Sequence, residues 1–311
     1  MGARAPRVAW RRVDGVLLLD KPPAVSSNAA LQRVRRAYRA ERAGHTGTLD
    51  PLASGLLPVL FGDATKFGAR VLEAEKRYRA TLALGVRTAT GDAEGAVIER
   101  RPVAVDPARL EAALARFVGS IAQVPPMHSA LKRAGRPLYA YARAGEVVAR
   151  EARTVTIHAL SVEAYAESRL VIDVRCSKGT YIRTLAEDIG ATLGCGAHLA
   201  ALVRTESGPF RLQDAYPLAA VEAASDDERG RFLLPADVLL GGLPRVTLEA
   251  GAAARFAQGQ AVGAPATAAT GTLCAYDAAG RLLGVGECGA DGRVRPLRLV
   301  RQDPPAPCER P

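Results

Sequence analysis

Three segments in the first two thirds of the chain have the pattern of apolar residues that is typical of β-strands. Residues 15–20 form a short continuous apolar run, which is typical of a buried strand, and two prolines follow it. Residues 77–85 and 170–176 instead alternate, with apolar side chains at every second position. The pattern therefore predicts three strands, of which the last two each bury one face.

Other apolar positions recur every three or four residues and predict helices. Polar residues 26–28 offer N-caps for a first helix, and Asp106 followed by Pro107 opens a second one. A third helix follows the turn at residues 177–180 and ends at Gly194, because glycine commonly terminates helices. These helices and the strands do not alternate regularly, so an α+β fold is favoured over a doubly wound α/β fold.

The pattern also divides the chain into domains. Residues 1–240 are expected to form the main domain, within which the polar and basic residues 123–153 are an exposed insertion with a helical stretch. Residues 225–231 are a charged link. After residue 241, short β-like runs separated by glycines predict a small β domain, 241–311, that ends in a disordered tail.

Composition places the chain among globular proteins. It has 311 residues, of which 48% are hydrophobic and 24% charged, enough to bury a core without staples. No apolar run approaches the ~20 residues of a membrane span, and the N-terminus lacks the pattern of a signal peptide. The expected location is the cytoplasm, with no membrane partner.

The cysteines do not indicate a disulfide framework or a metal site. There are five, an odd number, widely spaced and without a Cys-x-x-Cys pair, as expected for free thiols in a reducing compartment. Cys195 and His198 have a spacing seen in zinc sites, but a second pair is missing. No metal site is predicted.

Positive charge is concentrated near the N-terminus. The formal net charge is +10, and residues 1–44 contribute +7 of it, with ten basic and three acidic side chains. A polyanionic partner such as a nucleic acid would suit this distribution. The basic residues are 37 arginines and five lysines in an alanine-rich chain, so the base composition of the gene is an alternative explanation.

The most informative segment is residues 44–55, with the sequence GHTGTLDPLASG. Its glycines, threonines and proline predict a tight loop that carries one imidazole, His45, and one carboxylate, Asp50. Asp50 either caps a turn before Pro51 or is held rigidly in a cleft as a nucleophile or acid–base group. From the residues alone, His45 can be read as an ordinary loop histidine with its hydrogen bonds satisfied.

Two further segments offer partners for this carboxylate. Tyr181 and Arg183 lie in the first turn of the third predicted helix, where a guanidinium and the helix N-terminus would keep a carboxylate ionised. Residues 76–79 interleave basic side chains with Tyr78 on a strand, as in surfaces that stack bases and neutralise phosphates. The alternatives are that Arg183 lies on the surface, that Tyr181 is merely half-buried, and that Tyr78 is an ordinary core residue.

Together these segments closely resemble the bacterial tRNA pseudouridine-55 synthase family. The resemblance covers roughly residues 13–215 and includes the order and separation of the motifs. Its motifs are GVLLLDKP at 15–22, GHTGTLDPLASG at 44–55, KRY at 76–78, PPMHSALK at 125–132, LYAYAR at 138–143 and SKGTYIR at 177–183. The family's RNA-gripping insertion often has tyrosine where this chain has His128.

The resemblance implies isomerisation of uridine 55 in the T-loop of tRNA to pseudouridine, with Asp50 as nucleophile attacking either C6 of the base or C1′ of the ribose. Tyr78 would stack on the flipped uracil, and Arg183 would pair with Asp50. Tyr181 would contact the target nucleotide and Leu202 would line the pocket. His45 would fill the space that the uridine leaves. No metal or other cofactor is implied.

The implied fold is a mixed-sheet pseudouridine synthase core with a small PUA-like C-terminal β domain. The implied partner is the T-arm stem-loop of tRNA, without a guide RNA or an obligate protein partner. Two alternatives are a non-catalytic RNA-binding protein and the guide-RNA-dependent relative of archaea and eukaryotes. The joint presence of Asp50, Tyr78 and Arg183 disfavours the first. The insertion at 138–143 and the lack of lysine-rich tails disfavour the second.

Overall fold

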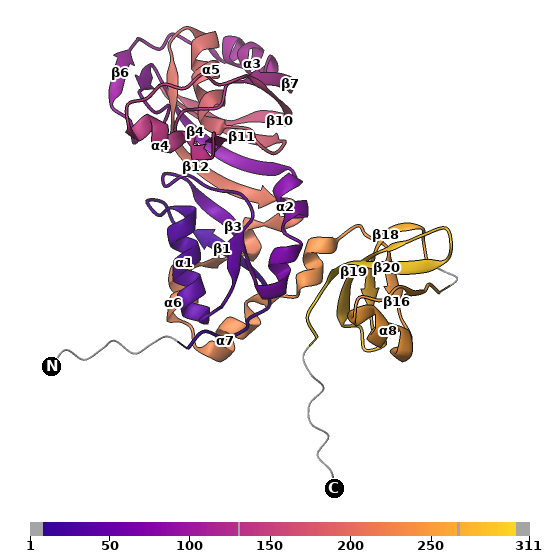
Figure 1. Cartoon of the computed structure of the whole chain (residues 1–311). Coiled ribbons are helices and arrows are strands. Elements are labelled where there is room, and N and C mark those ends of the chain that lie inside the picture. The colour runs from indigo at the N-terminus through magenta and orange to yellow at the C-terminus, as the bar shows by residue number, and fades with distance from the viewer. Residues whose placement is uncertain (1–8, 130, 266–267, 303–311) are drawn as a thin grey trace, which may run out of the picture.

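A large mixed sheet organises the first 240 residues. The computed structural model describes residues 9–129, 131–265 and 268–302 (Figure 1). In the described residues the sheet has eleven strands, and its main path runs β14-β1-β3-β12-β4-β11-β10-β7. These strands are β1 (Gly15–Lys21), β3 (Ser54–Phe61), β4 (Lys76–Leu84), β7 (Gly119–Gln123), β10 (Arg153–Ala166), β11 (Arg169–Cys176), β12 (Ala197–Ser207) and β14 (Tyr216–Pro217). Two neighbouring pairs, β1/β14 and β3/β12, are parallel and the others antiparallel, which confirms the α+β prediction.

The three predicted helices are present, with the caps predicted at Ser26, Asp106 and Gly194, although Tyr181 is the residue before the third helix and not in its first turn. The helices are α1 (Ser27–Tyr38), α3 (Pro107–Ala115) and α5 (Ile182–Leu193). Ser26 and Asp106 accept hydrogen bonds from the backbone of the first turns of α1 and α3, and Gly194 ends α5 with a φ of 81°. α1 and α6 (Leu218–Ala223) lie beside β1 and β3, whereas α3 and α5 cover the β4–β11 half of the sheet (Figure 1). The two halves thus have separate apolar clusters joined through β12 and β4.

Two sequence predictions in this domain are wrong in detail. Residues 43–55 are not all loop, because β2 (Ala43–His45) pairs with β3. The charged link is a helix, α7 (Asp226–Arg231), stabilised by a reciprocal capping box between Ser225 and Glu228. Its acidic side chains also neutralise part of the N-terminal positive charge, since Asp226 forms an ion pair with Arg39.

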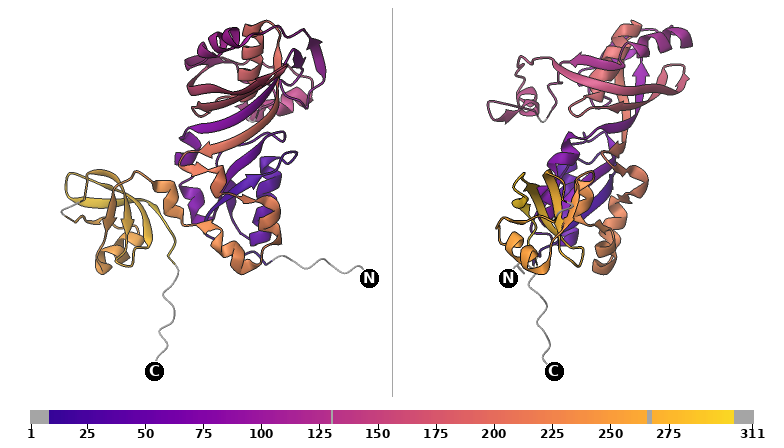
Figure 2. Two further views of the ribbon diagram at one scale, coloured as in Figure 1. Left: turned by 180° about the vertical axis from the view of Figure 1, so that it is seen from behind. Right: turned by 90° about the vertical axis from the view of Figure 1, so that its right-hand side faces the viewer.

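The insertion stands away from the sheet as an arm (Figure 2). It contains a short hairpin and one helix, with the elements β8 (Lys132–Arg133), β9 (Arg136–Pro137) and α4 (Leu138–Arg143). The remaining short elements of the main domain connect its strands: η1 (Gly62–Lys66), α2 (Ala69–Glu73), β5 (Val86–Thr88), β6 (Val97–Arg100), β13 (Phe210–Arg211), η2 (Leu212–Asp214), β15 (Leu233–Leu234) and η3 (Ala236–Leu240). Within the described segments, no helix is both long and apolar enough to cross a membrane.

The chain after residue 241 forms a second sheet, which confirms the predicted C-terminal β domain. Its strand order is β16-β18-β19-β20-β17, with a helix that the sequence did not predict. The elements are β16 (Arg245–Thr247), α8 (Ala250–Ala257), β17 (Val262–Gly263), β18 (Gly271–Tyr276), β19 (Leu282–Cys288) and β20 (Arg293–Leu299). Cys274 and Tyr276 pack in one apolar cluster with Leu239, Leu240 and Leu60 of the main domain. The predicted tail lies outside the described residues except for Gln302.

Candidate active site

Asp50 lies in the loop that connects β2 to β3, residues 46–53. Gly47 in this loop has a φ of 93°, a conformation that favours glycine. The backbone around Asp50 is fixed on both sides: Ala53 N–H donates to the Asp50 carbonyl over 3.1 Å, and Ala24 N–H donates to the Pro51 carbonyl over 2.8 Å. The Asp50 side chain is 40% exposed, so the carboxylate is held by a rigid loop and remains reachable.

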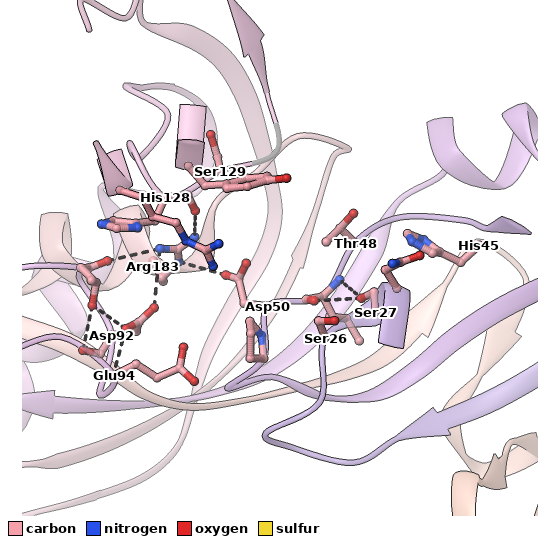
Figure 3. A pocket seen from close by; sticks show the side chains of 16 residues that line it. Ser26, Ser27, His45, Thr48, Asp50, Asp92, Glu94, His128, Ser129 and Arg183 are labelled. Carbon is pink, nitrogen blue, oxygen red and sulfur yellow. Dashed lines mark hydrogen bonds and ion pairs between the residues drawn. The ribbon is translucent and has the colours of Figure 1, made fainter. Parts of the chain in front are cut away.

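Arg183 places a buried positive charge against this carboxylate. Its side chain is only 5% exposed, and its Nε forms an ion pair of 3.0 Å with Asp50 Oδ2. Its Nη1 lies 3.5 Å from Asp92 Oδ2, and its Nη2 donates to the carbonyl oxygen of His128 over 2.6 Å (Figure 3). The guanidinium is therefore fixed between two carboxylates and the base of the insertion.

The charge state of Asp50 depends on this arrangement. Burial raises the pKa of the Asp50 carboxyl, and the nearby Asp92 raises it further, whereas the guanidinium of Arg183 lowers it. A carboxyl acting as a nucleophile must be ionised. Arg183 is thus the group that supports the ionised form of Asp50 against the effect of burial.

Asp92 is a site residue that the sequence did not reveal. It follows β5 in a tight turn, where its Oδ1 accepts hydrogen bonds from the Thr90 hydroxyl over 2.6 Å and from the Glu94 N–H over 3.1 Å. Its side chain is 5% exposed. An aspartate in a turn is common for such local bonds, so its residue type gave no separate signal.

Five predicted site residues line one cavity of about 410 Å³. They come from distant parts of the chain: Asp50, Tyr78 on β4, Tyr181 just before α5, Arg183 on α5 and Leu202 on β12. Burial raises the pKa of both tyrosine hydroxyls, so they are neutral near pH 7. The cavity combines one carboxylate, the guanidinium groups of Arg183 and Arg204, two lysine side chains, two aromatic rings and an apolar wall, a set suited to a planar polar ring.

His45 lies in a neighbouring cavity of about 490 Å³, which Asp50 and Arg183 also line (Figure 3). It is the last residue of β2, and burial lowers the pKa of its imidazole, with Arg204 adding to the effect. Its Nδ1 is buried without a hydrogen-bond partner among the described residues. A neutral ring that shares a cavity with Asp50 suits a spatial role better than an ionic one.

Gln123 positions Tyr181 and was also missed. It ends β7, and its buried side-chain amide forms two hydrogen bonds with the Tyr181 backbone: the Oε1 accepts from the N–H over 3.0 Å, and the Nε2 donates to the carbonyl over 3.3 Å. Nothing in the local sequence distinguishes this glutamine. Only the approach of β7 to the start of α5 gives it this role.

The basic residues around Tyr78 have hydrogen-bond and ion-pair partners within the protein. The buried Lys76 Nζ donates to the carbonyls of Val71 and Leu72 over 3.0 and 2.6 Å, and burial lowers the pKa of this lysine to about 8. Arg77 Nε pairs with Asp173 over 2.8 Å, and Arg79 pairs with Glu163. Lys76 thus stabilises the local backbone, whereas Arg77 and Arg79 lie in ion pairs with side chains that are 45% and 59% exposed.

Cys195 and His198, which have the spacing of zinc ligands, are packed or bonded within the protein. Cys195 is buried, and a ring nitrogen of His198, Nδ1, lies 2.9 Å from the Val86 carbonyl oxygen. Among residues 9–129, 131–265 and 268–302, no three histidine, cysteine or acidic side chains gather as a metal site would require. The four described cysteines are free and buried.

Three protein-family models together match most of the described chain. Residues 35–182 match the model described as TruB family pseudouridylate synthase, N-terminal domain. Residues 183–241 match tRNA pseudouridylate synthase B C-terminal domain, and residues 244–300 match Pseudouridine synthase II TruB, C-terminal. The boundary between the last two models falls where the second sheet begins.

Curated relatives and solved structures agree with these models. The chain is 57% identical over 301 residues to a tRNA pseudouridine synthase B of Burkholderia mallei, covering 95% of this chain and 96% of that protein. It is 54% identical over 292 residues to the protein of the same name from Thiobacillus denitrificans, covering 94% and 97%. A chain in the crystal structure of a Cbf5-Nop10-Gar1 complex is similar in structure, with a TM-score of 0.66 at 28% identity over 88% of this chain and 78% of that one.

Proposed function

Because this chain belongs to the TruB family of pseudouridylate synthases, we propose that it isomerises uridine 55 in the T-loop of tRNA to pseudouridine, with Asp50 as the nucleophile. The observation that carries the proposal is the ion pair between Asp50 and the buried Arg183 at the wall of the cavity that holds Tyr78, Tyr181 and Leu202. An anionic nucleophile is thereby presented to a pocket of a size and lining suited to one nucleobase.

In this proposal the uridine leaves the RNA stack and enters the cavity, since chemistry on a base inside a folded RNA requires extrusion. Tyr78 stacks on the uracil, Tyr181 contacts the nucleotide and Leu202 forms the apolar wall. The neutral His45, in the adjoining cavity, fills the place that the uridine leaves in the T-loop.

The chemistry begins with the ionised Asp50, whose carboxylate forms a bond to C6 of the uracil or to C1′ of the ribose. By either route the bond between N1 and C1′ breaks, the uracil turns, and C5 bonds to C1′. A bond from Asp50 to C1′ is released as the C5–C1′ bond forms, whereas a bond from Asp50 to C6 is released afterwards by elimination. The proton on C5 is lost and N1 gains a proton. Substrate and product are isomers, so no oxidant or reductant is consumed.

We also propose that the two domains, which meet at about residue 240, have different roles. Residues 1–240 carry the chemistry, with residues 123–153 gripping the T-arm, and residues 241–311 hold more distant parts of the tRNA. The reaction takes place in the cytoplasm and needs no guide RNA or protein partner. The four buried unpaired cysteines suit a reducing compartment.

The test is position-resolved mapping of pseudouridine in a tRNA transcript after incubation with the purified chain alone. The expected product is a single pseudouridine at position 55, in whole tRNA and in an isolated T-arm stem-loop. Modification at another position would refute the assignment of the substrate. Activity only after addition of guide RNA and accessory proteins would favour a guide-dependent enzyme like the Cbf5 of the similar complexes.

A further inference from the structure

Two buried side chains outside the predicted site are bonded to the backbone of the Asp50 loop. Arg204 lies on β12 and Ser27 at the start of α1, and they are 1% and 2% exposed. The sequence gave Arg204 no separate role, and Ser27 was one of three candidates, at residues 26–28, for the cap of α1. Of these, Ser26 makes the capping bond, accepting from the Ala29 N–H over 3.1 Å.

Arg204 connects the start of the Asp50 loop to the strand that follows it. Its Nε donates to the Leu56 carbonyl over 2.7 Å, and its Nη2 donates to the Gly47 carbonyl over 3.1 Å. No carboxylate pairs with it in the described residues. Burying a guanidinium without a carboxylate partner costs free energy. The hydrogen bonds from Arg204 to the Gly47 and Leu56 carbonyls offset part of this cost.

The fit between Arg204 and the loop is close. A Cβ on Gly47 would lie 3.4 Å from Arg204 Nη1, and a Cβ on Gly55 would lie 2.5 Å from the Arg204 carbonyl oxygen. Across the sheet, Arg204 pairs in register with Tyr78, and a hydrogen bond from Arg204 to the Tyr78 hydroxyl opposes the rise in the pKa of Tyr78. One side chain thus contacts both the nucleophile loop and the proposed stacking ring.

Ser27 fixes the loop from the opposite side. Its Oγ donates to the Leu49 carbonyl over 2.8 Å and accepts from the Leu49 N–H over 2.7 Å. Leu49 immediately precedes Asp50 in the chain. Because the hydroxyl donor is used and the side chain is buried, Ser27 has no donor left for a substrate.

We propose that Arg204 and Ser27 are positioning residues, which hold the Asp50 loop in the reactive geometry by bonding to its backbone at Gly47 and Leu49 and, at Leu56, to the strand that follows it. The inference rests on the proposed role of Asp50. Neither residue contacts the substrate in this proposal. Arg204 lines the cavity of about 410 Å³ and Ser27 the cavity of about 490 Å³, but the hydrogen bonds described above tie both side chains to the protein backbone. Their loss should therefore lower kcat and leave KM nearly unchanged.

The test compares Arg204→Met and Ser27→Ala with matched variants far from the site. Arg229 also donates to backbone carbonyls, to that of Val221 on α6 over 3.0 Å and to that of Ala37 at the other end of α1 over 2.9 Å, and it forms an ion pair with Asp226 over 3.0 Å. Ten residues of helix separate Ala37 from Ser27, or about 15 Å. Ser225 caps α7. Arg229→Met and Ser225→Ala thus remove similar bonds without touching the Asp50 loop.

Steady-state turnover, thermal unfolding and hydrogen exchange are measured for all four variants. A misplacement of a reacting group by 1 Å can cost about 100-fold in rate. We expect kcat to fall roughly 10- to 100-fold for Arg204→Met and about tenfold for Ser27→Ala, with KM within about threefold. Hydrogen exchange should accelerate at residues 46–53 in these two variants only. The Tm of the Arg229 and Ser225 variants should fall by a similar amount, and their kcat should stay that of the unaltered protein.

Some outcomes would overturn the inference. A full kcat for both variants would exclude positioning, and a raised KM at unchanged kcat would indicate direct RNA contact. Loss of kcat in proportion to Tm in all four variants would indicate general destabilisation. If Arg204→Met does not fold, Arg204→Lys, which keeps the charge and should recover part of kcat, and Ser27→Ala decide the question. An inactive Asp50→Asn beside a fully active Arg204→Met would refute only this inference, whereas an active Asp50→Asn would refute the proposed function.

Discussion

Arginines are used in opposite ways in the main domain and in the C-terminal β domain. Arg183 and Arg204 are almost fully buried. The groups that they bond to lie 50 or more residues away in the chain. Arg281 and Arg295 are 71% and 53% exposed and pair with aspartates four residues earlier. Exposed local pairs contribute at most about 1 kcal/mol. The buried arginines instead fix distant segments relative to one another, which a catalytic site requires.

The two regions are nevertheless physically joined. Cys274 and Tyr276 share an apolar cluster with Leu239 and Leu240, and Lys66 Nζ donates to the Leu299 carbonyl over 2.8 Å. Removing the C-terminal domain would expose this cluster and destabilise the main domain. Point substitutions therefore separate the contributions of the two regions better than truncation does.

The largest expected effect is that of Asp50→Asn. This change keeps the shape and removes the nucleophile, so product formation should vanish. Affinity for tRNA should stay within about tenfold, or ~1.4 kcal/mol. Product mapping and filter binding measure the two quantities. Asp277→Asn in the C-terminal domain is the matched control and should retain turnover. Measurable turnover by Asp50→Asn, free of deamidation, would contradict the assignment of the nucleophile.

Asp92→Asn should reduce turnover by about tenfold, because Arg183 would lose one of its two carboxylate partners. It should also move the pH profile. The charge of Asp92 raises the pKa of Asp50, so its removal lowers that pKa. Since Asp50 acts when ionised, activity declines as the pH falls through its pKa, and the acid limb should shift to lower pH. A shift to higher pH in kcat against pH would refute this coupling.

Tyr78 should show an effect on binding that depends on its ring. Tyr78→Ala should lose roughly 1 to 3 kcal/mol of stacking with the flipped uracil, whereas Tyr78→Phe should bind RNA normally. Binding isotherms with a T-arm stem-loop measure the difference, and circular dichroism verifies the fold. Equal affinities for the two variants would assign Tyr78 to the core of the sheet. Slow turnover with normal binding in Tyr78→Phe would indicate a role for the hydroxyl.

The smallest effect is expected from the exposed arginines of the C-terminal domain. Arg255→Gln with Arg298→Gln should weaken tRNA binding and flatten the slope of log affinity against log salt by about one unit per lost phosphate contact. Turnover at saturating tRNA should not change. Binding of the short T-arm stem-loop, which is the control substrate, should change less than binding of whole tRNA. A collapse of saturated turnover would refute the proposed division of labour.

The sequence by itself determined the local elements and the main candidates. The alternation from Arg77 to Gly85 predicted β4, and the caps at Ser26, Asp106 and Gly194 located three helices, because periodicity and capping act within a few residues. Motif resemblance then supplied Asp50 as the nucleophile. It also placed Arg183, Tyr78, Tyr181 and Leu202 around that carboxylate, but it did not indicate roles for Asp92, Gln123, Arg204 and Ser27.

Those neighbours were decided by the tertiary structure. β12 lies between β3 and β4, so Arg204 and Leu202 come beside the Asp50 loop and Tyr78. The same packing places Asp92 against Arg183 and buries Lys76, which the sequence suggested for RNA. Burial and long-range pairing depend on strand order, and strand order is set by the whole core. A local pattern can therefore identify a reactive residue, whereas its charge state and its rigidity are set by segments far away in the chain.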